Sequence, residues 1–194
     1  MIFLALVNSW GGKEAFSDYL LKTCQSLPLF ETTGYGYEIH EMSEMATAPF
    51  GQLAISNQPS FHVPYLFRYS NVPQYTSLLI KTIRQKAFRS GWDAYPGDED
   101  NGSLSAWYVW SALGLYPTCP GKANYDLGIP LFDHLRVYLA EKEQWLDIRT
   151  QQNHEHFHFV QDCHLDGKEV QSIGHQDLLN AQNLNFTLSW LPNH

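Results

Sequence analysis

The sequence predicts a mainly helical chain that ends in a small β unit. The prediction rests on a change in the spacing of apolar residues along the 194-residue chain. Up to about residue 125 they recur at three and four positions, as on one face of a helix. After Cys119-Pro120-Gly121 they alternate, as in strands with one buried face. We therefore predict two regions, a helical one over residues 1–125 and an antiparallel β unit over 126–194.

Glycine and proline divide the helical region into separate helices. The apolar start of the chain fits a helix that is already in progress at residue 1 and stops at Gly11-Gly12. Helical spacing then recurs in four segments, residues 13–26, 61–69, 74–88 and 103–115. The loops between these segments are long, and such loops often carry functional residues.

Strict alternation marks the β unit. Four to six antiparallel strands are expected there, and Asp166-Gly167 is a hairpin signal. The alternating sets are Leu135/Val137/Leu139, Leu146/Ile148, Phe157/Phe159 and Leu184/Phe186/Leu188/Trp190.

Composition excludes several classes of protein. The net charge of -8 argues against nucleic acid as a partner. The apolar start is too short for a membrane span and lacks the basic residues of a signal peptide, so neither is expected. Three cysteines without CxxC spacing indicate neither a disulfide framework nor a zinc site. The sequence leaves the cellular location open.

An acidic loop, Asp98-Glu99-Asp100, precedes the helix predicted over residues 103–115 and lies between Gly97 and Gly102. The partial positive charge of a helix N-terminus favours ionised carboxylates. In an extended loop Asp98 and Asp100 point to the same side, while Glu99 points away. Two such carboxylates can orient and deprotonate a water, as in inverting glycosidases, or share a divalent cation. The alternative is an acidic capping loop without chemistry.

Two histidine-containing stretches have alternative interpretations. His40-Glu41 begins like a zinc-protease motif, but Glu44 stands where the second histidine is required. The pair is then either part of a polar loop or a sugar-binding pair whose polar atoms fix one pyranose ring. His154, His156 and His158 alternate along a predicted strand, which favours a polar outer face over a metal site.

Several stretches, in the same order, resemble the C-terminal part of glycoside hydrolase family 92, the calcium-dependent exo-acting α-mannosidases. The likeness covers nearly the whole chain. The matching stretches are Gly34-Tyr35-Gly36-Tyr37-Glu38-Ile39-His40-Glu41-Met42, Phe50-Gly51-Gln52, residues 57–66, Pro96-Gly97-Asp98-Glu99-Asp100-Asn101-Gly102, Ser105-Ala106-Trp107-Tyr108-Val109, residues 114–117, Cys119-Pro120-Gly121 and residues 128–133.

The resemblance implies a function and roles for these residues. It implies that the helical region is part of an (α/α)6 toroid and that mannose is released from glycans with inversion. By position, Asp100 corresponds to the general base and Asp98 to its partner in holding the attacking water. His40 and Glu41 correspond to the pair that binds the sugar in α-1,2-specific members. Asn57 and Gln58 lie in the segment near calcium; the family often carries glutamate at the latter position.

The family's general acid, a glutamate, lies upstream of the region matched here, and so does the N-terminal β-sandwich. We therefore expect this chain to be the C-terminal part of an α-mannosidase and to be inactive on its own. The rival hypothesis is a catalytically inactive carbohydrate-binding or structural remnant. An incomplete toroid would expose apolar residues at its N-terminal edge and favour self-association. Those residues are Phe3, Leu4, Leu6 and Val7.

Overall fold

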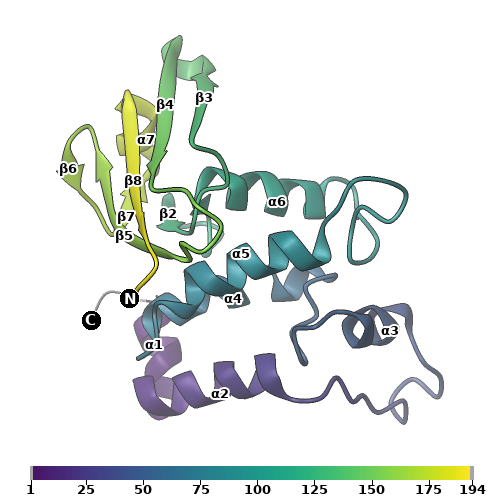
Figure 1. Cartoon of the computed structure of the whole chain (residues 1–194). Coiled ribbons are helices and arrows are strands. Elements are labelled where there is room, and N and C mark those ends of the chain that lie inside the picture. The colour runs from purple at the N-terminus through teal and green to yellow at the C-terminus, as the bar shows by residue number, and fades with distance from the viewer. Residues whose placement is uncertain (1, 193–194) are drawn as a thin grey trace. The chain divides into compact units, whose positions relative to one another are not determined.

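A computed structural model describes residues 2–192 (Figure 1). Helices fill the first part of the chain and strands most of the rest, which confirms the predicted order of a helical region followed by a β region. The chain divides into two compact units, which are described separately below. Unit 1 comprises Met1–Tyr75 and Thr82–Trp107, and unit 2 comprises Thr76–Lys81 and Tyr108–His194.

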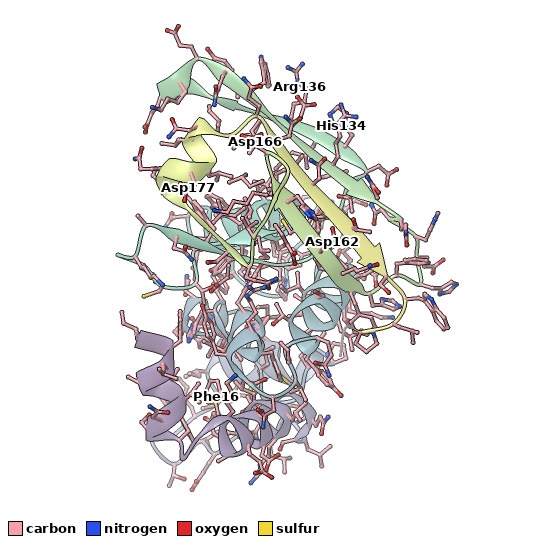
Figure 2. The ribbon with its side chains drawn as sticks, turned by 90° about the vertical axis from the view of Figure 1, so that its left-hand side faces the viewer. Phe16, His134, Arg136, Asp162, Asp166 and Asp177 are labelled. Atoms are coloured by element: carbon pink, nitrogen blue, oxygen red, sulfur yellow. The ribbon has the colours of Figure 1, made fainter. Side chains whose placement is uncertain are left out.

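Unit 1 is helical. Its elements are α1 (Ile2–Ser9), α2 (Lys13–Gln25), α3 (His40–Thr47), the 3₁₀ helix η1 (Gln58–Ser60), α4 (Val63–Leu66) and η2 (Phe67–Tyr69), with parts of α5 (Tyr75–Ala87) and α6 (Ser103–Leu113). The predicted helices 13–26, 74–88 and 103–115 agree with α2, α5 and α6 to within two residues. On α2, Phe16 is buried (Figure 2).

The single helix predicted over residues 61–69 is instead a series of short helical turns. Pro59 and Pro64 have no backbone N–H and cannot donate to a helical ladder. The amides that remain bond at the tighter i→i+3 spacing, as from Tyr65 N to His62 O at 3.0 Å. The prediction that this segment is helical is therefore confirmed, with the helical residues divided between α4 and η2.

The predicted apolar N-terminal edge is partly covered within unit 1. Val7 is 2% exposed, which corrects the expectation that it lies on an open edge. The ring of Phe3 stacks on that of Tyr69 with centroids 4.3 Å apart. Ile2 and Leu4 remain exposed at 63% and 60%. Self-association through this edge stays a prediction.

Unit 2 contains two sheets. The smaller has the order β1-β2-β7, with β1 at Leu115–Tyr116, β2 at Asn124–Leu127 and β7 at Ser172–Gly174. The larger has the order β3-β4-β8-β5-β6. Its strands are β3 (His134–Leu139), β4 (Gln144–Gln151), β5 (Phe159–Leu165), β6 (Lys168–Glu169) and β8 (Asn183–Ser189), and the unit also holds η3 (Ala140–Lys142) and α7 (His175–Asn180).

The inward-facing residues of unit 2 make one apolar cluster. Alternate residues of β4 and β8, such as Ile148, Leu184 and Phe186, are almost fully buried there. A Cβ at Gly114, where φ is +78°, would lie 2.8 Å from Pro130 Cγ, so glycine is needed at the end of α6. The predicted alternation of Leu184, Phe186 and Leu188 thus identified the buried face of β8, whereas Trp190, the fourth residue of the predicted set, lies beyond the strand and is exposed.

The β region is not wholly antiparallel, as had been predicted. Strand β8 pairs parallel with β4 and antiparallel with β5, because it inserts between them. Residues 152–182 separate β4 from β8, and a connection of that length permits parallel pairing. Alternation of apolar residues reports which face is buried but carries no information on strand direction.

The three alternating histidines do not lie on a strand. The segment from residue 152 to 158 forms turns, and β5 begins only at Phe159. Lys81 on α5 holds this segment by donating to the carbonyl oxygens of His154, Glu155 and Phe157 at 3.1, 2.9 and 2.7 Å. Among residues 2–192, no three His, Cys, Asp or Glu side chains are arranged to hold a metal ion.

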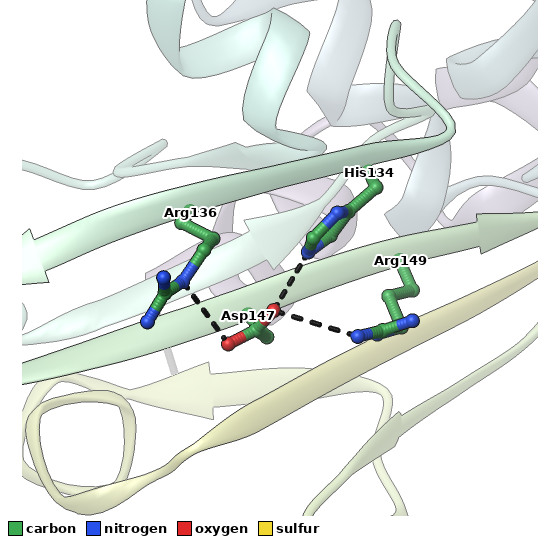
Figure 3. A network of polar contacts seen from close by, with 4 residues as sticks. All are labelled: His134, Arg136, Asp147 and Arg149. Atoms are coloured by element: carbon green, nitrogen blue, oxygen red, sulfur yellow. Dashed lines mark hydrogen bonds and ion pairs between the residues drawn. The ribbon is translucent and has the colours of Figure 1, made fainter.

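A polar network occupies the exposed face of the β3–β4 pair. Asp147 accepts a hydrogen bond from His134 Nε2 at 2.6 Å, and the guanidinium groups of Arg136 and Arg149 lie 3.4 and 3.7 Å from its carboxylate (Figure 3). The hydrogen bond from His134 lowers the pKa of Asp147, and the two arginine charges add to this. His134 and Arg136 project from the same strand (Figure 2).

No helix within residues 2–192 has the length and apolarity needed to cross a membrane.

Candidate functional site

The acidic loop of unit 1 lies between α5 and the start of α6, and Glu99 attaches it to that helix. Its carboxylate accepts hydrogen bonds from Gly102 N at 2.5 Å and Ser105 N at 3.0 Å. Bonds from the Ser105 side chain, the Ser105 amide and the Gly102 amide lower the pKa of Glu99. Glu99 therefore stays ionised at neutral pH at the positive end of the helix.

The other free amides at this helix end bond to backbone carbonyls of the same loop. Ser103 N donates to Asp100 O at 3.2 Å, and Leu104 N donates to Glu99 O at 3.3 Å. The turn that makes these two bonds has φ of 55° at Asp100 and 57° at Asn101. Both values lie in the left-handed region, which Asp and Asn tolerate better than most residues. The extended conformation predicted for the loop therefore does not continue through Asp100.

Aromatic contacts fix the helix that carries the loop. Trp107 is 1% exposed, and its Nε1 donates to Phe61 O at 3.0 Å. Its ring stacks on Phe88 at 5.6 Å between centroids. Tyr95, just before the loop, shares a 2.7 Å hydrogen bond with Ser105 Oγ. These contacts hold in place the first two turns of α6, which the acidic loop precedes.

Gly97 brings the loop close to α3 and to the segment before η1. A Cβ at this position would lie 2.7 Å from Ser56 Cβ and even closer to the carboxylate of Glu44. Ser56 is buried, and its Oγ has no hydrogen-bond partner within residues 2–192. Glycine is required here by close approach, since φ at Gly97 is not positive.

Two contacts connect Asp98 and Asp100 to residues distant in sequence. His40, the first residue of α3, has Nε2 3.8 Å from Asp98 Oδ2 and Nδ1 3.4 Å from Glu41 Oε2. Gln58 donates a hydrogen bond through its side-chain amide to Asp100 Oδ2. The side chains of His40 and Asp98 are 63% and 77% exposed, so the group is open to solvent and to a ligand.

Comparison with known proteins identifies the family. The family model of the glycosyl hydrolase family 92 catalytic domain matches residues 3–190. The chain belongs to glycosyl hydrolase family 92. An uncharacterized secreted glycosidase of Arthroderma benhamiae is 27% identical over 140 residues, which are 70% of this chain and 18% of that protein.

Solved family 92 structures share the fold. An inverting mannosidase from Bacteroides thetaiotaomicron is 34% identical with a TM-score of 0.78, over 99% of this chain and 27% of that one. An α-mannosidase from the same organism gives a TM-score of 0.78 at 24% identity, over 94% of this chain and 22% of that one. This family 92 chain thus spans about a quarter of the length of these solved relatives.

The structure brings together five of the six side chains that sequence reasoning selected in this family 92 chain. His40 contacts both Glu41 and Asp98, and Gln58 contacts Asp100. Asn57 is the sixth residue. Its carbonyl accepts a hydrogen bond from Ser60 N at 3.0 Å, and its side chain makes no hydrogen bond within residues 2–192.

Sequence reasoning missed three features of the site. It did not identify Glu99 as the residue whose carboxylate caps the helix. It did not anticipate that Glu44 and Ser56 lie against Gly97. It also left residues 40–47 without a helix, because this eight-residue segment carries only three apolar side chains, Met42, Met45 and Ala46.

Proposed function

We propose that this chain supplies the water-activating half of an inverting exo-α-mannosidase that removes terminal mannose from glycans. Asp100 is the general base, and Asp98 helps it to hold the attacking water. The observation that carries the proposal is the pair of contacts, His40 with Asp98 and Gln58 with Asp100, in a family 92 chain. The solved relative at 34% identity is itself described as an inverting mannosidase.

The chemistry assigned to the loop follows from its exposed, anchored carboxylates. A base that deprotonates water must be ionised and within hydrogen-bond reach of that water. The Gln58 amide fixes one oxygen of Asp100, which leaves the other oxygen available to accept a proton. In inverting glycosidases a proton-donating carboxylic acid stands roughly 6.5–9.5 Å from the base. In the proposed enzyme that acid belongs to a part of the protein outside this chain.

His40 and Glu41 are proposed to bind the substrate and to select α-1,2-linked mannose. An imidazole and a carboxylate that lie 3.4 Å apart can together bond to adjacent hydroxyl groups of one sugar ring. The contact between His40 and Asp98 supports this role, because Asp98 is one of the two residues proposed to hold the water. The helices of unit 1 are proposed to form part of an (α/α)6 toroid.

Calcium is proposed as the cofactor, and the available donors suit it. Ca²⁺ binds oxygen ligands that include side-chain amide oxygens, which Asn57 and Gln58 carry. The buried Ser56 Oγ, one residue before Asn57, has no hydrogen-bond partner within residues 2–192, which supports a polar ligand or ion at this place. When bound, calcium would supply positive charge for sugar hydroxyl groups. Asn57 and Gln58 are the residues proposed to hold it.

The test is Asp100→Ala in the full-length product of the gene, with mannose release from an α-1,2-linked disaccharide as the measurement. Loss of a general base should reduce turnover by roughly 10²–10⁴-fold. Asp18→Ala, on the exposed surface of α2, is the matched control and should leave turnover unchanged. Unchanged turnover in Asp100→Ala would refute the base assignment. Sugar binding without turnover in the unmodified protein would favour the inactive carbohydrate-binding alternative.

A further inference from the structure

Glu99 lies between the two proposed water-activating aspartates, yet its carboxylate is turned to the helix and not to them. Both carboxylate oxygens are occupied, one by the amide of Gly102 and the other by the amide of Ser105. The backbone carbonyl of the same residue accepts from Leu104 N. One residue thus satisfies three of the amides that a helix N-terminus leaves free.

We propose that Glu99 is a positioning residue of the reaction, whose carboxylate fastens the acidic loop to α6 and so sets the places of Asp98 and Asp100. This inference rests on the proposed function of those two aspartates. Glu99 itself touches neither substrate nor water in this assignment. It acts only through its neighbours on either side in the chain.

A second contact fastens the other end of the same loop. Tyr95 Oη and Ser105 Oγ share a hydrogen bond of 2.7 Å, and Ser105 N donates to the Glu99 carboxylate. Ser105 is therefore bonded to one residue before Asp98 and to one residue after it. Asp100 contributes its carbonyl to this attachment, accepting from Ser103 N and Ser103 Oγ, while its side chain stays available to Gln58. Within the loop, the Glu99 carboxylate and the Asp100 carbonyl anchor the chain to α6, while the side chains of Asp98 and Asp100 stay available for the proposed reaction.

The length and charge of glutamate both matter at this position. Aspartate is one methylene shorter and cannot span the amides of Gly102 and Ser105 from the same backbone place. Glutamine has the right length, but its NH₂ group donates and so cannot accept one of the two bonds. Glu99→Gln should therefore release one end of the attachment while it changes the volume of the side chain very little.

A plain helix cap would also stabilise the protein, so stability alone cannot test the proposal. The distinguishing readout is how the effect divides between kcat and KM. A misplaced water-activating pair slows the chemical step, whereas a loss of stability alone lowers the amount of folded enzyme and leaves the kcat of the folded molecules unchanged. In Glu99→Gln the kcat per folded molecule should fall while KM changes little.

The experiment compares Glu99→Gln with Glu14→Gln, which replaces a first-turn glutamate of α2. In the full-length product, Glu99→Gln should lower kcat about ten- to hundredfold, as a small misplacement of reacting groups does, with KM changed less than about threefold. Glu14→Gln should match the unmodified protein. Amide hydrogen exchange at Gly102 and Ser105 supplies a measure that needs no turnover.

The outcomes separate this inference from the proposed function. Amide exchange at Gly102 and Ser105 that is faster by roughly tenfold or more, together with a lower kcat, supports the positioning role. Reduced thermal stability with unchanged kcat would overturn it and leave a helix cap only. If Asp100→Ala keeps full turnover, the proposed function fails, and the amide exchange still decides whether Glu99 fastens the loop.

Discussion

Gly97 is the residue through which the acidic loop approaches α3. The absence of a side chain lets the backbone pass Ser56 and Glu44 at a distance that no Cβ would allow. Ser56 is buried and cannot move aside, whereas the Glu44 carboxylate ends a flexible side chain. The Ser56 contact therefore decides the cost of adding a methyl group.

Gly97→Ala should lower the free energy of unfolding by about 1–3 kcal/mol, the usual cost of overpacking. Thermal denaturation of the variant measures this. Gly34→Ala is the control, because a Cβ there meets nothing within 4 Å and φ is not positive. Equal melting temperatures for the two variants would show that the loop does not pack against Ser56 as described.

At the level of single residues, the sequence predicted which side chains lie together at the loop, but not how the loop is anchored. Asp98, Asp100, His40 and Glu41 were selected by residue type, spacing and family likeness, and the structure joins them in two groups. The role of Glu99 as cap was missed because acids in a loop before a helix have no fixed pairing with its amides. The contact of Gly97 with Ser56 joins positions far apart in sequence, which local patterns do not encode.

Among the elements, the β3–β4 hairpin carries a charge network whose effect depends on pH. Asp147 has its pKa lowered first by the hydrogen bond from His134. A carboxyl whose pKa is lower in the folded state stabilises the protein above its unfolded pKa, near 4. That contribution is lost as the pH falls through the lower, folded value.

Asp147→Asn should therefore reduce stability at pH 7, and the difference from the unmodified protein should shrink below about pH 4. Urea denaturation at pH 7, 5 and 3 checks this. Asp162→Asn is the control, because Asp162 lies beside one histidine only, with Oδ1 3.2 Å from His164 Nδ1. A difference for Asp147→Asn that is as large at pH 3 as at pH 7 would contradict the electrostatic explanation.

Lys81 secures the turn between β4 and β5 with three hydrogen bonds to carbonyl oxygens. Lys81→Met keeps the apolar stem but removes the donors, and should cost about 1–3 kcal/mol of stability. Lys86→Met, at an exposed position on α5, serves as the control. Chemical denaturation of both variants gives the comparison, and equal midpoints would argue against this attachment.

Most elements could be predicted from apolar spacing. The exceptions are segments in which the spacing of residues does not report the conformation of the backbone or the direction of the strand. Helices α2, α5 and α6 have strong periodic patterns and were found. Helix α3 has no buried side chain, and in the turn at 152–158 histidine recurs at every second position, as one face of a strand would. The parallel pairing of β4 and β8 depends on chain connectivity, which alternation does not report.

For the whole molecule, the exposed residues of α1 predict an association between copies of the 194-residue chain. Ile2 and Leu4 are more than half exposed, and apolar side chains grouped at one edge favour burial against a partner. Light scattering should show the chain above monomer mass, and Leu4→Gln should shift it toward the monomer. Leu191→Gln, at a residue of similar exposure in unit 2, should not. A monomeric unmodified chain would contradict the prediction.

The stereochemistry of mannose release tests most directly the proposal that this family 92 chain provides the base of an inverting α-mannosidase. The full-length product of its gene should be incubated with α-1,2-mannobiose and calcium while proton magnetic resonance follows the anomers of the released mannose. Inversion predicts that β-mannose appears first and that α-mannose follows only by mutarotation. The first appearance of α-mannose, or no release of mannose by that protein, would contradict the account.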